Sequence, residues 1–254
     1  MLDAHTVDEL AGRLDAAQTA VTDTLSLADT HTLTIDDAYA VQAALLDRRT
    51  ARGERITGVK LGFTSKAKMA QMGVSEIIVG RLTDAMRVAD GGDVELSRLI
   101  HPKVEPEVAF RLARDVDPAA PDTDITTCVD AVAPALEIID SRYRDFRFTY
   151  EDVVADNTSA AGYAIGAWSP LRDVGDLTVR LSNAEQEVTG STVAILDGPL
   201  NALRALLDMA RRRSVPLRAG DVVLAGAATA AMPLTAGVTT CEVSGLGRVT
   251  VRSV

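Results

Sequence analysis

The fold is decided by a stretch that reads VEPEVAFRLA at residues 104–113. It belongs to a series of short β-rich runs separated by turn signals such as Asp90-Gly91-Gly92-Asp93. The other runs are RITGVKLGF (55–63), PALEIID (134–140), YAIGAW (163–168), LTVRLS (177–182), DVVLAG (221–226), CEVSG (241–245) and RVTVRSV (248–254). Together they predict a chain that is mostly β from residue 56 onward.

Helices are predicted at fewer and less regular positions. Thr6 with Glu9 forms a capping-box pattern, and Thr34 with Asp37 forms a second one, whose helix should end near Arg52-Gly53. Further helices are expected over Ser65–Met72, around Ile125–Val132 and over Pro199–Arg213.

A doubly wound sheet would alternate strands and helices regularly, and this chain does not. The predicted fold class is therefore α+β. We expect a helical N-terminal region at residues 1–55 and a larger mixed-β domain at residues 56–254.

Composition excludes several classes of protein. The 254 residues are 47% apolar and 24% charged, which suits one large globular domain rather than a disordered chain. A net charge of −10 argues against nucleic acid or an anionic membrane as the partner. No run of about 18 apolar residues could span a bilayer, and the acidic start does not resemble a signal peptide. Cys128 and Cys241 form neither a disulfide framework nor a zinc site. We expect a cytoplasmic protein.

Glu105 and Glu107 are the first candidate functional residues. Residues two apart on a strand point to the same side, so both carboxylates should lie on one face. Two like charges that close are unfavourable without a cation between them. The alternative is an exposed strand that carries two solvated glutamates.

Glu137 is a third acid, and it lies inside the apolar run PALEIID. A carboxylate buried there needs a partner, because an unpaired buried charge is strongly unfavourable. A salt bridge to Arg142 or Lys103 would satisfy it. If the three glutamates instead converge, they form a hard oxygen site suited to Mg²⁺ or Mn²⁺.

Lys60 lies between Val59 and Leu61. It is either a surface residue with a buried stem or a cation that faces an anionic substrate. The run ADNTSAAG (155–162) is dense in small polar groups, which form loops and also donate hydrogen bonds to carboxylates. The sequence has no GxSxG, GxGxxG or P-loop spacing, so serine-hydrolase, dinucleotide and nucleotide-phosphate chemistry lack support.

The combination of these segments resembles the hydratase/decarboxylase branch of the fumarylacetoacetate hydrolase superfamily. The matching segments are GVKLGFTSKAKMAQMGV (58–74), GRLTDAM (80–86), LIHPKVEPEVAF (99–110), PALEIIDSRYRDFRF (134–148), VVADNTSAAG (153–162) and the tail from AGD to GLG (219–247). They occur in the family's order over most of the chain. The resemblance implies a mixed-β roll with a small helical N-terminal part, assembled into a homo-oligomer.

The resemblance also implies the residues of an active site. The implied metal ligands, for Mg²⁺ or Mn²⁺, are Glu105, Glu107 and Glu137. The implied catalytic residues are Lys60 and Asp84, and the residues expected to bind a small 2-oxo acid substrate are Ser159, Thr64 and Asn157.

Two activities of this branch remain open. One is decarboxylation of 2-oxo-3-hexenedioate (4-oxalocrotonate) to 2-hydroxypenta-2,4-dienoate and CO₂ in meta-cleavage aromatic degradation, which the run SRYRDFRF and the position of Asp84 favour. The other is hydration of 2-hydroxypentadienoate (2-keto-4-pentenoate). The acylpyruvate-hydrolysing branch fits less well, because it generally takes an aspartate where this chain has Glu137.

A third alternative is a non-catalytic, metal-binding partner subunit, because Gly198 and Ala225 replace polar residues that are usual in the family. The resemblance also implies association with a partner hydratase or decarboxylase.

Overall fold

A computed structural model describes residues 1–65, 69–70 and 73–254 of the chain. The strands are β1 (Ile56–Gly62), β2 (Ile78–Thr83), β3 (Arg87–Val88), β4 (Asp93–Val94), β5 (Lys103–Leu112), β6 (Val129–Ile139), β7 (Ala160–Ile165), β8 (Ser169–Pro170), β9 (Thr178–Ser182), β10 (Glu187–Ser191), β11 (Val222–Ala227), β12 (Met232–Pro233), β13 (Gly237–Val243) and β14 (Gly247–Ser253). The α-helices are α1 (Ala4–Thr19), α2 (Ile35–Ala51), α4 (Tyr150–Ala155) and α5 (Pro199–Arg213). Short 3₁₀ turns are η1 (Leu27–Asp29), η2 (Asp84–Met86), η3 (Leu96–Arg98), η4 (Ile125–Cys128), η5 (Arg144–Phe146), η6 (Asn157–Ser159) and η7 (Thr192–Ala194).

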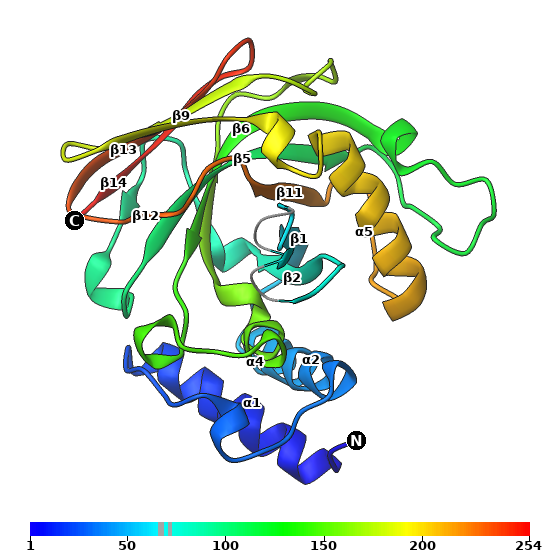
Figure 1. Cartoon of the computed structure of the whole chain (residues 1–254), viewed down its shortest axis with the longest axis vertical. Coiled ribbons are helices and arrows are strands. Elements are labelled where there is room, and N and C mark those ends of the chain that lie inside the picture. Colours follow the sequence, from blue (N-terminus) through cyan, green and yellow to red (C-terminus); the bar gives the residue numbers. More distant parts are fainter. Residues whose placement is uncertain (66–68, 71–72) are drawn as a thin grey trace.

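The strands form two mixed sheets (Figure 1). Within the described residues, the larger sheet has nine strands, with the path β2-β1-β11-β5-β6-β7-β3 and with β12 beside β5 and β8 beside β6. The smaller sheet has the order β10-β9-β13-β14-β4. Parallel pairs (β1 with β11, β3 with β7, β14 with β4) occur among antiparallel ones. The predicted α+β class, with mixed sheets and few helices, is confirmed.

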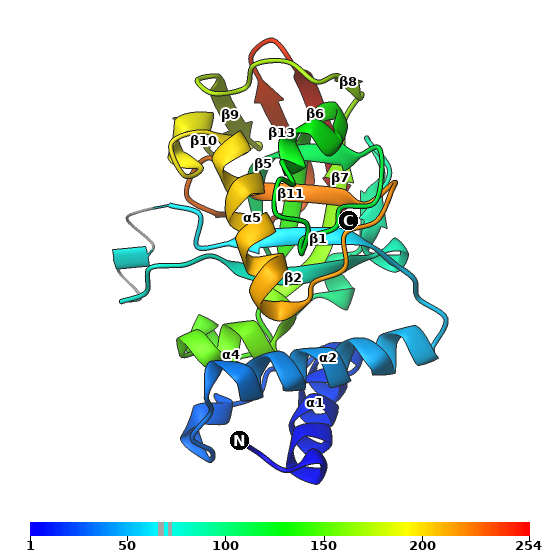
Figure 2. The same cartoon turned by 90° about the vertical axis from the view of Figure 1, so that its right-hand side faces the viewer.

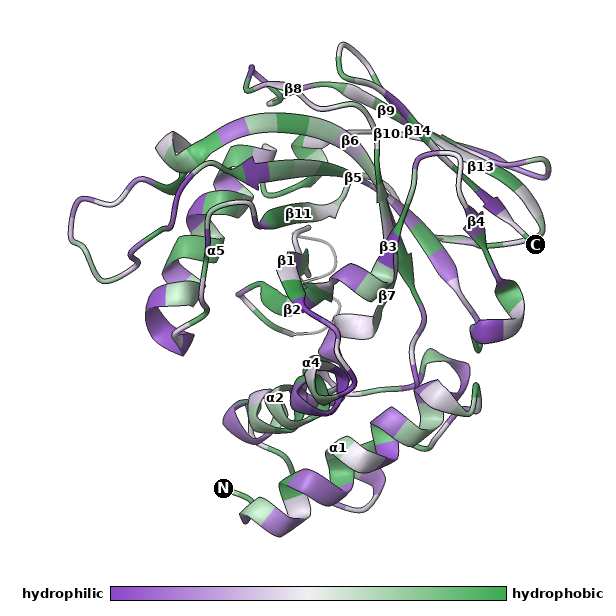
Figure 3. Ribbon diagram, turned by 180° about the vertical axis from the view of Figure 1, so that it is seen from behind, coloured by the Kyte–Doolittle hydropathy of each residue, from purple (hydrophilic) through white to green (hydrophobic). Residues whose placement is uncertain are grey.

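The central pair of the larger sheet is β5 and β6, whose antiparallel register runs from Lys103 opposite Ile139 to Leu112 opposite Val129. Both strands are mostly hydrophobic (Figure 3), and the main apolar core is built around them. The amphipathic helix α5 packs on this core beside β11 (Figure 2) and buries Leu203 and Leu206 there. A buried apolar core therefore supports the acid-bearing face of β5 and β6.

The helices α1, α2 and α4 lie together on one side of the sheets (Figure 2). Their shared apolar cluster includes Leu14, Leu45 and Val154. The Gln42 amide on α2 donates hydrogen bonds to the carbonyls of Val79 on β2 and Val154 on α4. This buried amide ties the helical layer to the sheet. In the part of the chain that the structure describes, no helix is long and apolar enough to cross a membrane.

Several predicted boundaries need correction. The first helix begins at Ala4 and not after Thr6, because the Asp3 carboxylate accepts a hydrogen bond from the Thr6 amide and caps it. The helix expected around Ile125–Val132 is wrong: only the turn η4 forms, because β6 begins at Val129 to pair with β5. The short helix α4 was not predicted.

Other predictions are confirmed. Thr34 and Asp37 form the capping box of α2, which ends at Ala51, and the helix over Pro199–Arg213 is α5. The helix expected over Ser65–Met72 falls largely outside the described residues.

Candidate active site

Three glutamates converge where β5 and β6 pair. Glu105 lies directly opposite Glu137 in the register, and Glu107 follows two residues later on the same face of β5. One carboxylate oxygen of each lies within 4.8 Å of the others. Glu107 and Glu137 are buried, whereas Glu105 is half-buried. The strand spacing of Glu105 and Glu107, together with the register that sets Glu137 opposite Glu105, therefore produces one cluster of acids.

The cluster is suited to a divalent cation. The Gly226 amide donates a 2.7 Å hydrogen bond to Oε2 of Glu107, whereas Oε1 of Glu107 is buried and has no hydrogen-bond partner among the described residues. Burial, and then the charge of Glu137, raise the pKa of Glu107 well above its ordinary value. Carboxylate oxygens alone, with no histidine or thiolate, are the donors that Mg²⁺ and Mn²⁺ prefer. The residues present fit such an ion.

Lys60 is the buried cation of the site. Its ammonium lies 2.9 Å from Oε1 of Glu137 and donates a 3.0 Å hydrogen bond to the carbonyl of Thr158. Burial lowers the pKa of Lys60, but the charges of Glu137, Glu105 and Glu107 outweigh it and raise that pKa above its ordinary value. The interpretation of Lys60 as a surface residue is wrong.

Neither of the two ion-pair partners suggested from the sequence for Glu137 pairs with it. Arg142 pairs with Asp156 instead, and the Lys103 ammonium lies 4.0 Å from the centre of the Phe146 ring. Lys60 takes the place of both candidates because the sheet brings β1 to face β6.

The carbonyl that orients Lys60 belongs to a left-handed turn. Asn157, Thr158 and Ser159 have φ angles of 48°, 53° and 60°, a conformation that residues other than glycine seldom adopt. The Asn157 amide holds the turn, because its Oδ1 accepts from the Arg81 backbone amide and its Nδ2 donates to the Arg81 carbonyl. A Cβ at Gly80 would lie 2.1 Å from Oγ1 of Thr158, so β2 must carry glycine there.

A buried ion pair that sequence reasoning missed supports this turn. Arg142 donates from its side chain to the carboxylate and carbonyl of Asp156 and to the carbonyls of Asp140 and Ala160. Both members of the pair are buried. An arginine directly after an apolar strand was the available signal, but it was assigned to Glu137.

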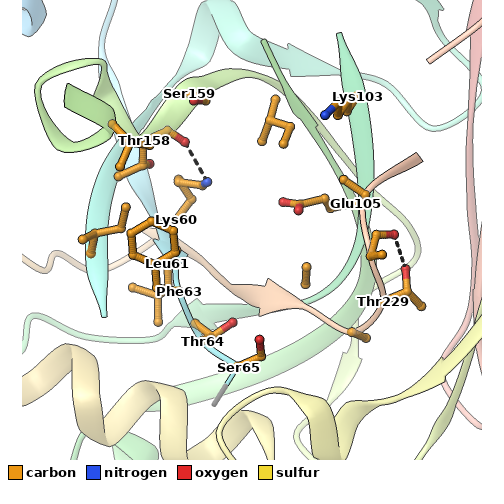
Figure 4. Close-up of a pocket in the computed structure, with 18 of the residues that line it drawn as sticks. Lys60, Leu61, Phe63, Thr64, Ser65, Lys103, Glu105, Thr158, Ser159 and Thr229 are labelled. Carbon is orange, nitrogen blue, oxygen red and sulfur yellow. Dashed lines mark hydrogen bonds between the residues drawn. The ribbon is translucent and has the colours of Figure 1, made fainter. Parts of the chain in front are cut away.

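A cavity of about 620 Å³ opens beside the acid cluster, and Glu105 lines it. Figure 4 shows Lys60 and Glu105 pointing into it from opposite walls. Thr64 and Ser159 line it as well, together with Lys103 and Phe146. The structure thus brings together Lys60, Thr64, Ser159 and the three glutamates predicted from the sequence.

Two predicted site residues lie elsewhere. Asp84 is at the end of β2, where its carboxylate accepts from the Arg55 backbone amide at 2.9 Å and pairs with the Arg55 side chain at 2.8 Å. These hydrogen bonds lower the pKa of Asp84. Asn157 has its amide committed to Arg81, as described above. Among the described residues, neither belongs to the lining of the cavity.

Comparison with known proteins places this chain in a family. No protein-family model matches the chain. It is 44% identical to a 4-oxalocrotonate decarboxylase of Pseudomonas sp. over 95% of both chains. It is 39% identical to a 2-keto-4-pentenoate hydratase of Paraburkholderia xenovorans, over 85% of this chain and 83% of that one.

Structural comparison leads to the same group of proteins as the sequence comparison. The structure of 4-oxalocrotonate decarboxylase from Pseudomonas putida G7, complexed with magnesium and adipate, superposes with a TM-score of 0.94 and 36% identity, over 100% of this chain and 99% of that one. The chain belongs to the family of the 4-oxalocrotonate decarboxylases and 2-keto-4-pentenoate hydratases. Its fold also resembles that of a protein described as a fumarylacetoacetate hydrolase family member from Yersinia pestis, at a TM-score of 0.59.

Proposed function

We propose that the protein is a metal-dependent carbon–carbon lyase that converts 2-oxo-3-hexenedioate (4-oxalocrotonate) to 2-hydroxypenta-2,4-dienoate and CO₂. The observation that carries this proposal is the cluster of Glu105, Glu107 and Glu137 with Lys60, of which Glu105 and Lys60 line a single cavity. The 44% identity to a decarboxylase over nearly the whole of both chains supports the choice of reaction.

The metal is a divalent cation such as Mg²⁺, and the three glutamates would hold it. When bound, it supplies a Lewis acid for the 1-carboxylate and 2-oxo oxygens of the substrate and for the charge that develops there. The similar structure of 4-oxalocrotonate decarboxylase from Pseudomonas putida G7, which contains magnesium and adipate, supports this choice of ion.

The reaction shifts three electron pairs along a conjugated chain, from the C5–C6 bond to the 2-oxygen. The C5–C6 bond breaks and its electrons form the C4–C5 double bond. The C3–C4 π electrons move to C2–C3, and the carbonyl electrons move onto the 2-oxygen. CO₂ leaves, and the enolate oxygen takes up one proton.

Lys60 is placed to act on the 2-oxygen in this scheme. Its ammonium, which pairs with Glu137, would serve there as a charge partner or an acid. The Thr158 carbonyl and Glu137 fix the direction of its ammonium. The hydroxyls of Thr64 and Ser159 face the same cavity and are suited to bind the substrate carboxylate.

For the two residues outside the cavity we propose other roles. Asn157 positions the turn that carries Thr158 and Ser159, through its two hydrogen bonds to Arg81. Asp84 fixes the start of β1 through Arg55.

Hydration of 2-hydroxypentadienoate is the second candidate function, because relatives named 2-keto-4-pentenoate hydratase reach 39% identity. One assay separates the candidates. The protein is incubated with Mg²⁺ and each substrate, and CO₂ and 4-hydroxy-2-oxopentanoate are quantified separately, with EDTA as the control. CO₂ release that EDTA abolishes supports the decarboxylase, and hydroxy acid without CO₂ supports the hydratase. If neither product forms, the result would favour a non-catalytic subunit.

We also propose that the active unit is a cytoplasmic homo-oligomer that associates with a partner hydratase. The support is membership of the family. Light scattering that gave the 26.8 kDa of one chain under active conditions would contradict this proposal.

A further inference from the structure

Lysine is rare in this chain. Only four of its 26 basic residues are lysines (Lys60, Lys66, Lys68 and Lys103), and the rest are arginines. Lys60 and Lys103 both line the cavity, while Lys66 and Lys68 lie outside the described residues. Since arginine makes up 22 of the 26 basic residues of this sequence, a lysine in the cavity wall marks a place suited to a compact ammonium rather than a planar guanidinium.

Lys103 shares a face with the metal-binding acids. On β5, every second side chain points to the same side of the sheet. That side carries Lys103, Glu105 and Glu107. Figure 4 shows Lys103 on the same wall of the cavity as Glu105. Two residues of strand span roughly 7 Å, which is about the length of a six-carbon chain. A dicarboxylate with one end at the glutamates would therefore place its other end near Lys103.

Lys103 is available for a ligand. Its ammonium contacts the face of the Phe146 ring, 4.0 Å from the centroid, and it forms no ion pair with any of the described residues. A cation above an aromatic ring is held more weakly than one paired with a carboxylate. The preceding loop is fixed, because both carboxylate oxygens of Asp140 accept hydrogen bonds, from the backbone amides of Ile100 and His101. The backbone is thus rigid and the ammonium is free to move.

We propose that Lys103 is the specificity residue that binds the distal carboxylate of the substrate, the group at C6. This inference rests on the function proposed above. Lys103 selects a dicarboxylate over a monocarboxylate of the same length, and Phe146 holds its ammonium when that carboxylate is gone. It is distinct from Lys60, which faces the 2-oxo end.

The C6 carboxylate loses its negative charge as it becomes CO₂. An ion pair to that group therefore stabilises the bound substrate more than the transition state. Loss of Lys103 should lower kcat/KM through KM, whereas a general distortion of the site would lower kcat.

The test compares two unreactive ligands, 2-oxohexanedioate and 2-oxohexanoate, which differ only in the distal carboxylate. Calorimetry in saturating Mg²⁺ should give at least about tenfold tighter binding of the dicarboxylate to the unmodified protein. In Lys103→Met, which keeps the apolar stem over Phe146, this preference should fall below about threefold through weaker dicarboxylate binding alone. Lys103→Arg should retain most of the preference.

Arg98→Met is the matched control, since it removes an exposed cation that pairs with Glu95 outside the cavity. It should leave the preference unchanged. The inference is overturned if Lys103→Met weakens both ligands equally, if it leaves the preference intact, or if the unmodified protein has no preference. Release of CO₂ from 2-oxo-3-hexenedioate is measured separately. Its absence would defeat the proposed function, while the ligand ratio would still decide the role of Lys103.

Discussion

Lys60 and Glu137 form a buried ion pair, with 2.9 Å between the ammonium and Oε1, although β11 and β5 separate their strands in the sheet. The sheet must curl for β1 to face β6, and the concave side of that curl is the active-site cavity. Around the pair, three carboxylates face one ammonium. One divalent cation would balance the two negative charges left over.

Replacing Glu107 with Gln should weaken metal binding strongly while the fold survives. The change removes one ligand charge from a site of three, so we expect Mg²⁺ affinity to fall by about 10² or more. Without metal, stability should hold or rise, because a buried acid with a raised pKa is gone. Calorimetry measures the affinity, and Glu187→Gln, an exposed acid on β10, is the control. Unchanged Mg²⁺ affinity in Glu107→Gln would contradict the assignment of Glu107 as a metal ligand.

Replacing Lys60 with Met should remove the cation that we propose acts on the substrate and keep the apolar part of the side chain. Turnover should fall by on the order of 10²–10⁴, the usual range for a lost general acid. Mg²⁺ affinity should hold or rise, since a positive neighbour of the glutamates has gone. Steady-state kinetics at saturating Mg²⁺ measure the effect. Near-normal kcat and KM would mean that Lys60 takes no part in the reaction.

Replacing Asp84 with Asn separates the sequence-based prediction from the role proposed here. If Asp84 only anchors Arg55, turnover should stay within about threefold of normal, because its carboxylate lies outside the cavity lining. A loss of 10² or more in kcat would instead restore Asp84 as a catalytic residue. Arg55→Met breaks the same contact from the other side and should match Asp84→Asn in both rate and melting temperature.

Replacing Gly80 with Ala should disturb catalysis from outside the cavity. The new Cβ would lie 2.1 Å from Oγ1 of Thr158 and 2.7 Å from the Asn157 carbonyl, so the turn must move. We expect a loss of about 1–3 kcal/mol in stability, together with a fall in kcat, because Lys60 loses its carbonyl partner. Thermal melts and kinetics measure both. Gly12→Ala, on α1, should leave the rate unchanged, and an unaffected rate in Gly80→Ala would contradict the proposed role of the turn.

Asp37 should make the free energy of unfolding depend on pH in the acid range. The Thr34 hydroxyl, and then the Leu2 and Thr34 amides, lower the pKa of Asp37 from 3.8 to about 2. Because the folded-state pKa is the lower one, the carboxylate stabilises the fold at neutral pH, and this contribution is lost as pH falls from about 4 to about 2. Asp37→Asn should therefore reduce the free energy of unfolding by about 1–2 kcal/mol at pH 7 and by little at pH 2.

Urea denaturation at both pH values tests this prediction. Asp47→Asn, an exposed change on the same helix, serves as control. An equal loss at pH 2 and pH 7 would show that the Asp37 charge is not responsible.

The sequence by itself determined the features that depend on local geometry. The strand period of two put Glu105 and Glu107 on one face, and the apolar run around Glu137 marked that acid as buried. The spacing of Thr34 and Asp37 fixed the start of α2, and Pro199 with its leucines fixed α5. Each of these depends on residues a few positions apart, whose relative directions are set by backbone periodicity.

Tertiary structure decided which strands and turns face each other. Lys60 lies 77 positions before Glu137, and no local pattern could distinguish it from Arg142 or Lys103 as the partner of that acid. The pairing of β6 with β5 converted the expected helix near Val129 into strand. Asp84, which belongs to a family motif, turns to Arg55 because β2 ends beside the start of β1. Charged side chains take the partner that the folded chain brings closest, and long-range strand pairing alone settles that choice.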